Sequence, residues 1–272
     1  IQRPPDMKRI ACCVELLALR RITHPKPRAT ECRMALDQVP IVGFAADLIC
    51  PERCGACATL VRPHQLFCDT CWTRVDRLGP PECTSCGCPR STAGRCDPCA
   101  HPGSPIRTAR AWAAYHHPNG ASSVARAIAS FKYGGARRLG RRLATAMLAR
   151  VPAPDVSLVV PVPLHVRRLR QRGFNQSAVL ARHLGRSLEC RVALSLVVRM
   201  RNTPSQVTLS PEARAANVAG AFAVRHPALV RDRTILVIDD VWTSGATARA
   251  VAAALRAAGA TAVDVLTLAR AL

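Results

Sequence analysis

The chain has 272 residues, of which 49% are apolar, so its composition is that of a globular protein with a sizeable core and not of a disordered one. No apolar run approaches the roughly 18 residues that span a bilayer, so we predict no membrane span and a cytoplasmic location. The net charge of +22 favours polyanionic partners such as nucleic acid or phosphorylated metabolites. Only Lys8, Lys26 and Lys132 of the 39 basic residues are lysine, and a GC-rich genome also produces such arginine usage.

Residues 1–33 carry no recognisable chemistry. They begin without methionine and show no sustained hydrophobic period, whereas Met34 opens a stretch that leads into a cysteine-rich zone. We interpret residues 1–33 as a disordered or mis-annotated extension ahead of a natural start at Met34. The alternative is a genuine basic tail.

The cysteine-rich zone, residues 45–102, has the spacing of a tandem metal site. Eight of the fourteen cysteines form two quartets of Cys-x2-Cys pairs: Cys54, Cys57, Cys68 and Cys71, then Cys83, Cys86, Cys96 and Cys99. This spacing suits structural, tetrahedral Zn²⁺ in a reducing compartment better than disulfides. We predict two zinc ribbons; the alternatives are one zinc with free cysteines, or interleaved ligation. Because few apolar residues lie here, we expect metal to supply the folding energy.

The same zone carries arginines and two aromatic residues, Phe67 and Trp72. These could contact single-stranded DNA through charge and stacking. They also fit a ribbon that docks on the rest of the chain with a solvated basic face and a small aromatic core. Both interpretations stay open, and we slightly favour docking.

From residue 105 onward, β-branched runs alternate with amphipathic stretches, a pattern typical of βαβ units and of a doubly wound, mainly parallel α/β sheet. The predicted strands are Arg110–Tyr115, Ser157–Val162, Leu194–Arg199, Ala221–Val224, Thr234–Ile238 and Ala262–Leu268. The predicted helices are Ser123–Phe131, Gly140–Arg150, Phe174–Leu188 and a last one that ends near Ala258, before Gly259.

The segment Ile235–Thr247 gives the strongest functional signal. Its apolar strand leads into Asp239 and Asp240, and thus brings two carboxylates to the sheet edge where open α/β sheets bind ligands. A loop with hydroxyls and backbone N–H groups at a helix start follows, and it forms an anion site. The loop consists of Thr243, Ser244, Gly245, Ala246 and Thr247. A ribose phosphate with vicinal hydroxyls, together with Mg²⁺, would satisfy both parts; an ordinary capped helix is the alternative.

Two further polar segments lie upstream. Four arginines fall within residues 167–172, and guanidinium groups of this kind match phosphate oxygens. A solvated basic face is the alternative, and we interpret His165 as a structural or rim residue. The polar stretch Arg201–Pro211 is long enough to close over a bound ligand and exclude water.

Ile235–Thr247 resembles the phosphoribosyl pyrophosphate (PRPP) motif of type I phosphoribosyltransferases. The resemblance implies that Asp239 and Asp240 hold the ribose hydroxyls and that Thr243–Thr247 cradle the 5′-phosphate. Trp242 departs from the motif, in which a smaller aliphatic residue or tyrosine is usual.

Over about residues 45–272 the chain resembles the ComF family, double-zinc-ribbon phosphoribosyltransferase-like proteins linked to DNA uptake in competent bacteria. The matching blocks are Phe131–Gly135, Pro161–His165, Arg170–Gln176, Arg199–Gln206 and the Asp239–Thr247 loop. The implied catalytic residues are Asp239, Asp240, Arg199 and Arg201. The implied diphosphate contacts are Arg167, Arg168, Arg172 and Lys132, and the implied closing loop contains Thr203, Gln206 and Arg214.

The sequence therefore predicts a zinc-ribbon domain at 45–102 and a phosphoribosyltransferase-like domain at 105–272. The implied function is Mg²⁺-dependent transfer of ribose 5-phosphate from PRPP to an unidentified acceptor, in the context of DNA uptake with DNA-uptake proteins as partners. The alternative is a non-catalytic PRPP- or nucleotide-binding module whose ribbons contact single-stranded DNA. The acceptor and the oligomeric state do not follow from the sequence.

Overall fold

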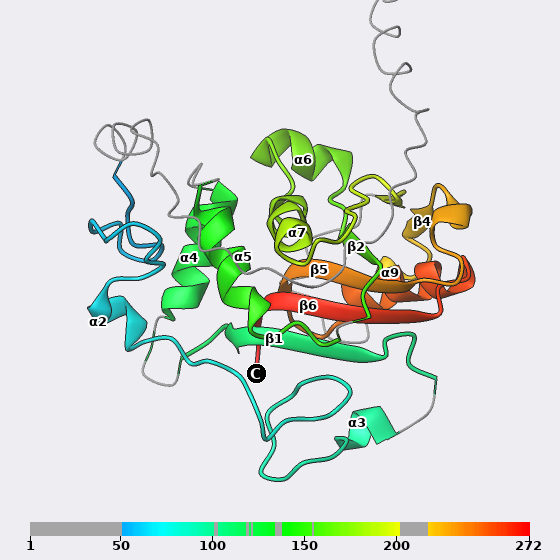
Figure 1. The fold of residues 1–272 in the computed structure, drawn as a ribbon, viewed down its shortest axis with the longest axis horizontal. Coiled ribbons are helices and arrows are strands. Elements are labelled where there is room, and N and C mark those ends of the chain that lie inside the picture. Colours follow the sequence, from blue (N-terminus) through cyan, green and yellow to red (C-terminus); the bar gives the residue numbers. More distant parts are fainter. Residues whose placement is uncertain are drawn as a thin grey trace, which may run out of the picture. The chain divides into compact units, whose positions relative to one another are not determined.

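The computed structural model describes residues 51–100, 103–117, 120, 122–133, 138–153, 155–201 and 217–272 (Figure 1). The predictions for residues 1–50, including the natural start at Met34, lie outside these ranges. The polar stretch from 202 to 216, with Thr203, Gln206 and Arg214, lies outside them as well.

A parallel four-stranded sheet organises the fold. Its strands are β1 (Thr108–Ala114), β2 (Leu158–Pro161), β5 (Thr234–Trp242) and β6 (Ala262–Arg270), in the order β1-β6-β5-β2. Every ladder between them is parallel. The apolar run Ile235–Ile238 makes β5 a strand that is buried on both faces, as its central position requires.

Helices cover both faces of this sheet. One apolar cluster joins α4 (Ser123–Tyr133), α5 (Leu139–Leu148) and α7 (Gln176–Ser187) to Leu236 and Ile238. The other joins α9 (Ala246–Ala257) to Ile235 and Val237. Because successive strand residues point to opposite faces, the alternation along β5 assigns the two helix layers to opposite sides. The predicted doubly wound α/β fold is confirmed.

Three elements differ from the sequence-based predictions. The arginine-rich segment forms a helix, α6 (Val166–Arg172), where only a basic stretch was predicted, and β5 continues past Ile238 through both carboxylates to Trp242. The predicted strands near 194–199 and 221–224 do not extend the parallel sheet. They form a separate antiparallel pair, β3 (Val197–Arg199) and β4 (Phe222–Val224). Each strand has only three residues, and both belong to the apolar cluster that contains α9. A short 3-10 turn, Pro227–Leu229, follows β4.

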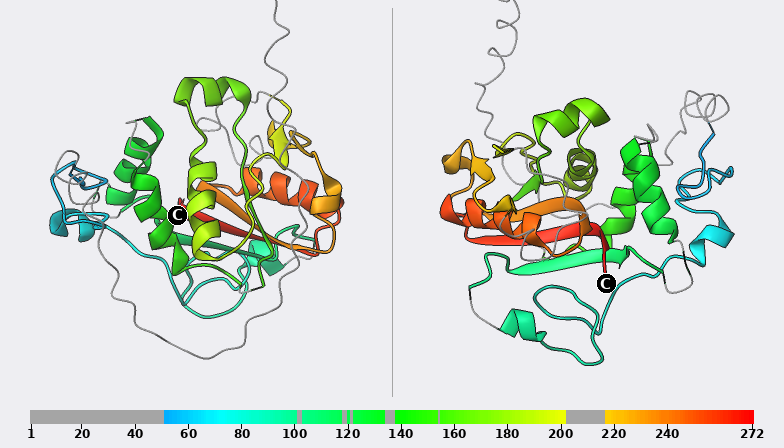
Figure 2. Two further views of the ribbon diagram at one scale, coloured as in Figure 1. Left: turned by 45° about the horizontal axis from the view of Figure 1, so that its top comes forward. Right: turned by 180° about the vertical axis from the view of Figure 1, so that it is seen from behind.

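The chain that leads from the first cysteine quartet into the second covers the outer edge of β1. Leu78 N–H donates to Trp112 O (2.9 Å), Ala114 N–H to Asp76 O (2.8 Å), and Ala109 N–H to Ser85 O (2.7 Å). Figures 1 and 2 show this cyan segment running beside β1. An edge strand offers unpaired N–H and C=O groups, and here the cysteine-rich zone satisfies them.

The first cysteine quartet, beside the short helix α2 (Asp69–Trp72), also joins the core of the sheet. Phe67 is 1% exposed, and its ring centroid lies 6.5 Å from that of Trp112 on β1. Phe67 is therefore a docking residue, whereas Trp72 is 43% exposed. The second quartet lies beside α3 (Asp97–Ala100).

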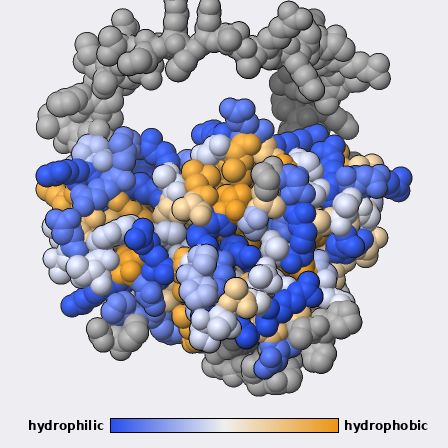
Figure 3. Space-filling view, turned by 60° about the horizontal axis from the view of Figure 1, so that its bottom comes forward, coloured by the Kyte–Doolittle hydropathy of each residue, from blue (hydrophilic) through white to orange (hydrophobic). Residues whose placement is uncertain are grey.

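No helix in the described part of the chain is long and apolar enough to cross a membrane. On the face drawn in Figure 3, hydrophilic side chains surround separate apolar patches.

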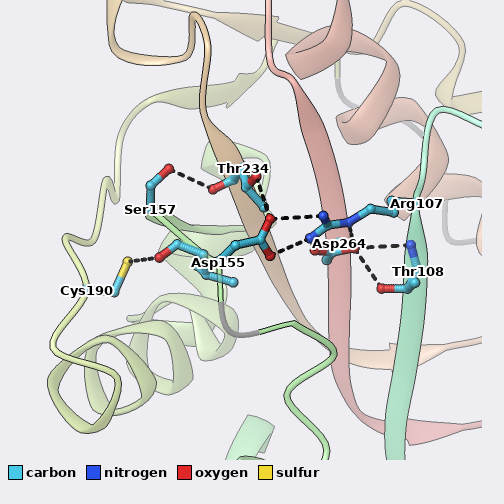
Figure 4. A network of polar contacts seen from close by, with 8 residues as sticks. Arg107, Thr108, Asp155, Ser157, Cys190, Thr234 and Asp264 are labelled. Atoms are coloured by element: carbon cyan, nitrogen blue, oxygen red, sulfur yellow. Dashed lines mark hydrogen bonds and ion pairs between the residues drawn. The ribbon is translucent and has the colours of Figure 1, made fainter.

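A buried carboxylate, Asp264, connects strands at the end of the sheet where β1 begins, and Figure 4 shows its contacts. It accepts hydrogen bonds from Arg107 Nε (3.0 Å), Thr108 N (3.2 Å) and Thr108 Oγ1 (2.7 Å). Arg107 also contacts Asp155 through both Nη atoms (3.0 and 2.9 Å), and Asp155 accepts from Thr234 Oγ1 (3.2 Å). The network thus connects β1, β6, β5 and the chain that leads into β2.

We expect Asp264→Asn to destabilise the protein by about 2 kcal/mol or more, because the Arg107 guanidinium and two donors of Thr108 lose a buried, ionised acceptor. Urea unfolding followed by circular dichroism measures this loss. Asp155→Asn is the matched control, since that side chain contacts the same guanidinium but is 53% exposed. An equal loss in the two variants would contradict the assignment of Asp264 as the anchor.

Candidate functional site

The loop between β5 and α9 has the geometry of an anion-binding site. β5 ends at Trp242 and α9 begins at Ala246, so the N–H groups of a twelve-residue helix open onto residues 243–247. Gly245 has φ +74°, and a Cβ there would lie 2.4 Å from Cζ2 of Trp242. Only glycine fits this position, both for its backbone conformation and for its close approach to the indole.

This loop lines a cavity of about 820 Å³ at the carboxyl ends of the strands. Most of the predicted site residues meet there. From β5 and the loop come Asp239, Asp240, Thr243, Gly245, Ala246 and Thr247; from other elements come Lys132, Arg168, Arg172 and Arg199. One cavity therefore combines an anion-binding loop, paired carboxylates and four cationic side chains.

The two carboxylates have different surroundings. Asp239 Oδ1 accepts from Ser177 Oγ (3.0 Å) and from Asp240 N–H (2.9 Å). Burial, together with the neighbouring Asp240 charge, raises the pKa of Asp239 to about 7. Asp240 Oδ2 lies 2.6 Å from Lys132 Nζ, in an ion pair of two largely buried side chains. Lys132, which the resemblance assigned to the diphosphate, thus neutralises a carboxylate in this structure.

The arginines approach the cavity from two sides. Arg172 donates to Gln176 Oε1 (3.1 Å) and to Tyr133 Oη (3.0 Å), and its guanidinium lies 5.1 Å from the centroid of the Tyr133 ring. Arg199 lies 5.5 Å from the centroid of the Phe222 ring, and burial followed by the nearby Arg168 charge lowers its pKa. These arginines therefore bring positive charge into the cavity that holds the two carboxylates.

Three predicted site residues, Arg167, Arg201 and Ser244, do not line the cavity. Arg167 is exposed on α6 and does not line the cavity, and neither does Arg201, which donates to Ala219 O. Ser244 is also absent from the lining, and its Oγ accepts from Ala246 N–H (3.4 Å) as a local cap. His165 is structural: its Nδ1 accepts from Arg167 N–H (3.3 Å) and caps α6.

Several lining residues were not predicted as site residues. Tyr115 and His116 follow the end of β1, while Gln176 and Ser177 begin α7. The rule that ligands bind beyond the carboxyl ends of parallel strands points to Tyr115 and His116 once β1 is assigned to the sheet. Ser177 carries no comparable signal, because its role depends on the position of α7 relative to β5.

The cysteines form two separate quartets with metal-site geometry. Within each quartet, Cys54–Cys71 and Cys83–Cys99, the sulfur atoms lie within 4.8 Å of one another. Cys57 and Cys68 sulfurs are 3.6 Å apart and Cys86 and Cys96 sulfurs 3.7 Å apart, close to the roughly 3.8 Å that tetrahedral Zn–S bonds of about 2.3 Å require. The quartets therefore fit two structural zinc sites without interleaving. Cys88 lies outside them and donates to Pro89 O.

Backbone donors prepare one of these thiols for metal. Burial opposes ionisation of Cys83, yet N–H groups of Cys86 (3.5 Å) and Cys96 (3.3 Å) point at its sulfur. These donors outweigh the burial and lower the pKa of Cys83 to about 6, which favours the thiolate that zinc binds.

Comparisons with known proteins agree with this arrangement. A family model described as double zinc ribbon domain matches residues 45–100, and one described as phosphoribosyl transferase domain matches residues 175–272. DNA utilization protein YhgH of Escherichia coli K12 is 31% identical over 236 residues, which cover 83% of this chain and 100% of that protein. Competence protein F of Haemophilus influenzae is 33% identical over 117 residues, 42% of this chain and 50% of that one.

Among solved structures, a glutamine PRPP amidotransferase from B. subtilis aligns with 48% of this chain and 25% of its own, at 21% identity and a TM-score of 0.32. The assignment rests instead on the two family matches and on the full-length relative. The chain belongs to the ComF family, in which a double zinc ribbon precedes a phosphoribosyltransferase-type domain.

Proposed function

We propose that the protein binds PRPP with Mg²⁺ and transfers its ribose 5-phosphate to an acceptor, with release of diphosphate. The observation that carries this proposal is the single cavity that joins residues 243–247, the Asp239–Asp240 pair and four cationic side chains. A phosphate, two vicinal hydroxyls and a diphosphate are the groups that such a lining recognises.

The loop would bind the 5′-phosphate. The first-turn N–H groups of α9 and the hydroxyls of Thr243 and Thr247 are suitable donors, and the positive end of the helix favours an anion. Gly245 lets the backbone approach the phosphate closely.

The carboxylates would hold the ribose. Asp239 is costly to ionise in the free protein, since burial and Asp240 raise its pKa. Two ribose hydroxyls would donate to Asp239 and Asp240 and so stabilise the ionised forms. Mg²⁺, which prefers oxygen ligands, would neutralise charge on the diphosphate, and these carboxylates are the cavity's acidic groups that could assist in holding it.

The cations would stabilise the leaving group. As the bond between C1 and the diphosphate oxygen breaks, negative charge moves onto the diphosphate and the ribose becomes cationic. Arg168, Arg172 and Lys132 can face the first charge. Lys132 would then exchange Asp240 for a diphosphate oxygen, which frees that carboxylate for a ribose hydroxyl. In this proposal Arg199, which lines the cavity, assists catalysis, and Thr203, Gln206 and Arg214 belong to the loop that closes the site.

The names of the relatives suggest the biological setting. Proteins similar to this chain are named for DNA utilization and for competence. We therefore place the reaction in DNA uptake, inside the cell, with DNA-uptake proteins as partners.

A second candidate is a PRPP- or nucleotide-binding module that contacts single-stranded DNA without turnover. Tyr133 favours it, because this ring is 73% exposed beside the cavity and stacks with Arg172. An exposed aromatic ring beside a guanidinium is a sequence-tolerant platform for a nucleobase. Diphosphate release during incubation with PRPP, Mg²⁺ and nitrogen nucleophiles (ammonia, nucleobases) separates the two candidates, since only the transferase produces it.

Calorimetric titration of PRPP and Mg²⁺ into the zinc-loaded protein tests the cavity. We expect micromolar binding, and its loss in an Asp239→Asn/Asp240→Asn double variant, because neutral amides replace the acceptors of both ribose hydroxyls. Asp155→Asn, at the opposite end of the sheet, serves as the control and should bind normally. No binding by folded wild-type protein would reject the transferase proposal and favour the DNA-binding candidate.

The raised pKa of Asp239 predicts a trade-off between function and stability. The native state binds this proton more tightly than the unfolded state, so wild-type protein should lose stability as the pH rises from about 4 through 7. Asp239→Asn removes this cost and should be more stable than wild type by about 2–4 kcal/mol at pH 8, but nearly equal to it at pH 4. Urea unfolding at several pH values measures the difference. A pH-independent difference would show that Asp239 titrates normally.

A further inference from the structure

The last residue of β6, Arg270, lies between the second cysteine quartet and the phosphate loop. Its side chain is buried, and Nη2 donates to the backbone carbonyl of Cys86. The guanidinium also lies 4.8 Å from the centroid of the Trp242 ring. One side chain therefore contacts a metal-binding turn and the residue on which the loop rests.

The indole of Trp242 packs directly against the phosphate loop at Gly245. The indole is 5% exposed and lies so close to Gly245 that a methyl group there would overlap it. Arg249 stacks at 5.6 Å from the same ring and donates from Nη1 to Ser244 O (2.5 Å). A shift of the indole would consequently move residues 244 and 245, whose backbone shapes the anion site.

The charge of Arg270 needs a partner that the sheet does not provide. Arg270 is only 6% exposed. Among the residues that the structure describes, no carboxylate forms an ion pair with its guanidinium. A Zn²⁺ ion with four thiolates carries a net charge of −2. The second quartet would supply this negative charge directly behind the Cys86 carbonyl. An opposite charge at this place would offset the cost of burying the Arg270 guanidinium.

We propose that Arg270 is a positioning residue that couples zinc in the second ribbon to the conformation of the phosphate loop. Zinc bound at Cys83–Cys99 holds Arg270 against Trp242, and Trp242 supports Gly245. When the metal leaves or these thiols are oxidised, Arg270 loses its counter-charge, the indole shifts, and the loop loses its anion-binding geometry. The effect on PRPP rests on the proposed function, whereas the movement of Trp242 does not.

The first ribbon provides an internal comparison. Arg142 on α5 is 9% exposed and donates to the carbonyls of Gln65 (2.5 Å), within the first ribbon, and Arg53 (3.0 Å), next to Cys54. In each ribbon, therefore, a buried arginine of the α/β domain donates to backbone carbonyls of the cysteine-rich zone. Arg142 does not line the phosphate-site cavity, so its loss should loosen the first ribbon without affecting the loop.

The experiment uses the full chain with Trp72→Phe and Trp112→Phe, which leaves Trp242 as the single tryptophan of the three in the sequence. Four variants are compared in this background: Arg270→Met, Arg142→Met, Cys99→Ser and Cys57→Ser. Zinc content, circular dichroism, Trp242 fluorescence with acrylamide quenching, and PRPP binding are measured for each. Arg270→Lys, which keeps the charge, tests rescue.

We expect Cys99→Ser and Arg270→Met to shift Trp242 emission to longer wavelength and to increase its quenching, with a loss of PRPP affinity of about tenfold or more. Arg270→Met should also release one of its two zinc ions at lower chelator concentration, because coupling is reciprocal. Cys57→Ser and Arg142→Met should leave the Trp242 signal unchanged. Arg270→Lys should restore part of it.

A folded Arg270→Met variant with wild-type Trp242 fluorescence and quenching would overturn the coupling. Because this readout needs no ligand, it remains decisive if the wild-type protein does not bind PRPP. Absence of PRPP binding in every variant, with the expected fluorescence changes, would reject the proposed function and leave the coupling intact.

Discussion

The burial of β5 between β6 and β2 is the constraint on which the rest of the structure depends. Its apolar residues contact helices on both faces, so the strand has one register and one direction. That register fixes where Asp239 and Asp240 leave the core and where α9 begins. The anion-binding loop, the carboxylate pair and the cavity are consequences of this one buried strand and the turn that follows it.

The cysteine-rich zone is part of the same structural unit as the α/β domain. Its backbone covers the free edge of β1, Phe67 enters the core, and Arg142 and Arg270 donate to its carbonyls. The sequence led us to expect a ribbon with too little apolar surface for a core. The structure shows that Leu66 and Phe67 of the first ribbon instead join the core of the sheet, so this ribbon does not depend on a core of its own.

The cavity is arranged for a ligand more than for the stability of the free protein. Placing two carboxylates side by side, and several partly buried guanidinium groups in one cavity, costs free energy, as the raised pKa of Asp239 and the lowered pKa of Arg199 indicate. The Lys132–Asp240 ion pair relieves part of this cost. A bound molecule with phosphate and hydroxyl groups would relieve more, which is how binding energy is concentrated at such sites.

The sequence by itself determined the fold class, the main-sheet strands, the loop at 243–247 and both cysteine quartets, because each depends on spacing along the chain: period 2 or 3.6 in hydrophobicity, Cys-x2-Cys pairs, and a strand that leads into a helix. Contacts between distant segments were decided only by the tertiary structure. In the folded chain Lys132 pairs with Asp240, and Ser177 donates to Asp239. The arginine-rich stretch forms α6 with Arg167 outside the cavity, and Arg270 donates to the carbonyl of Cys86. Ser177 and Asp239 are 62 residues apart in the sequence, and Cys86 and Arg270 are 184 residues apart. No local sequence pattern records which distant side chains a folded sheet brings together.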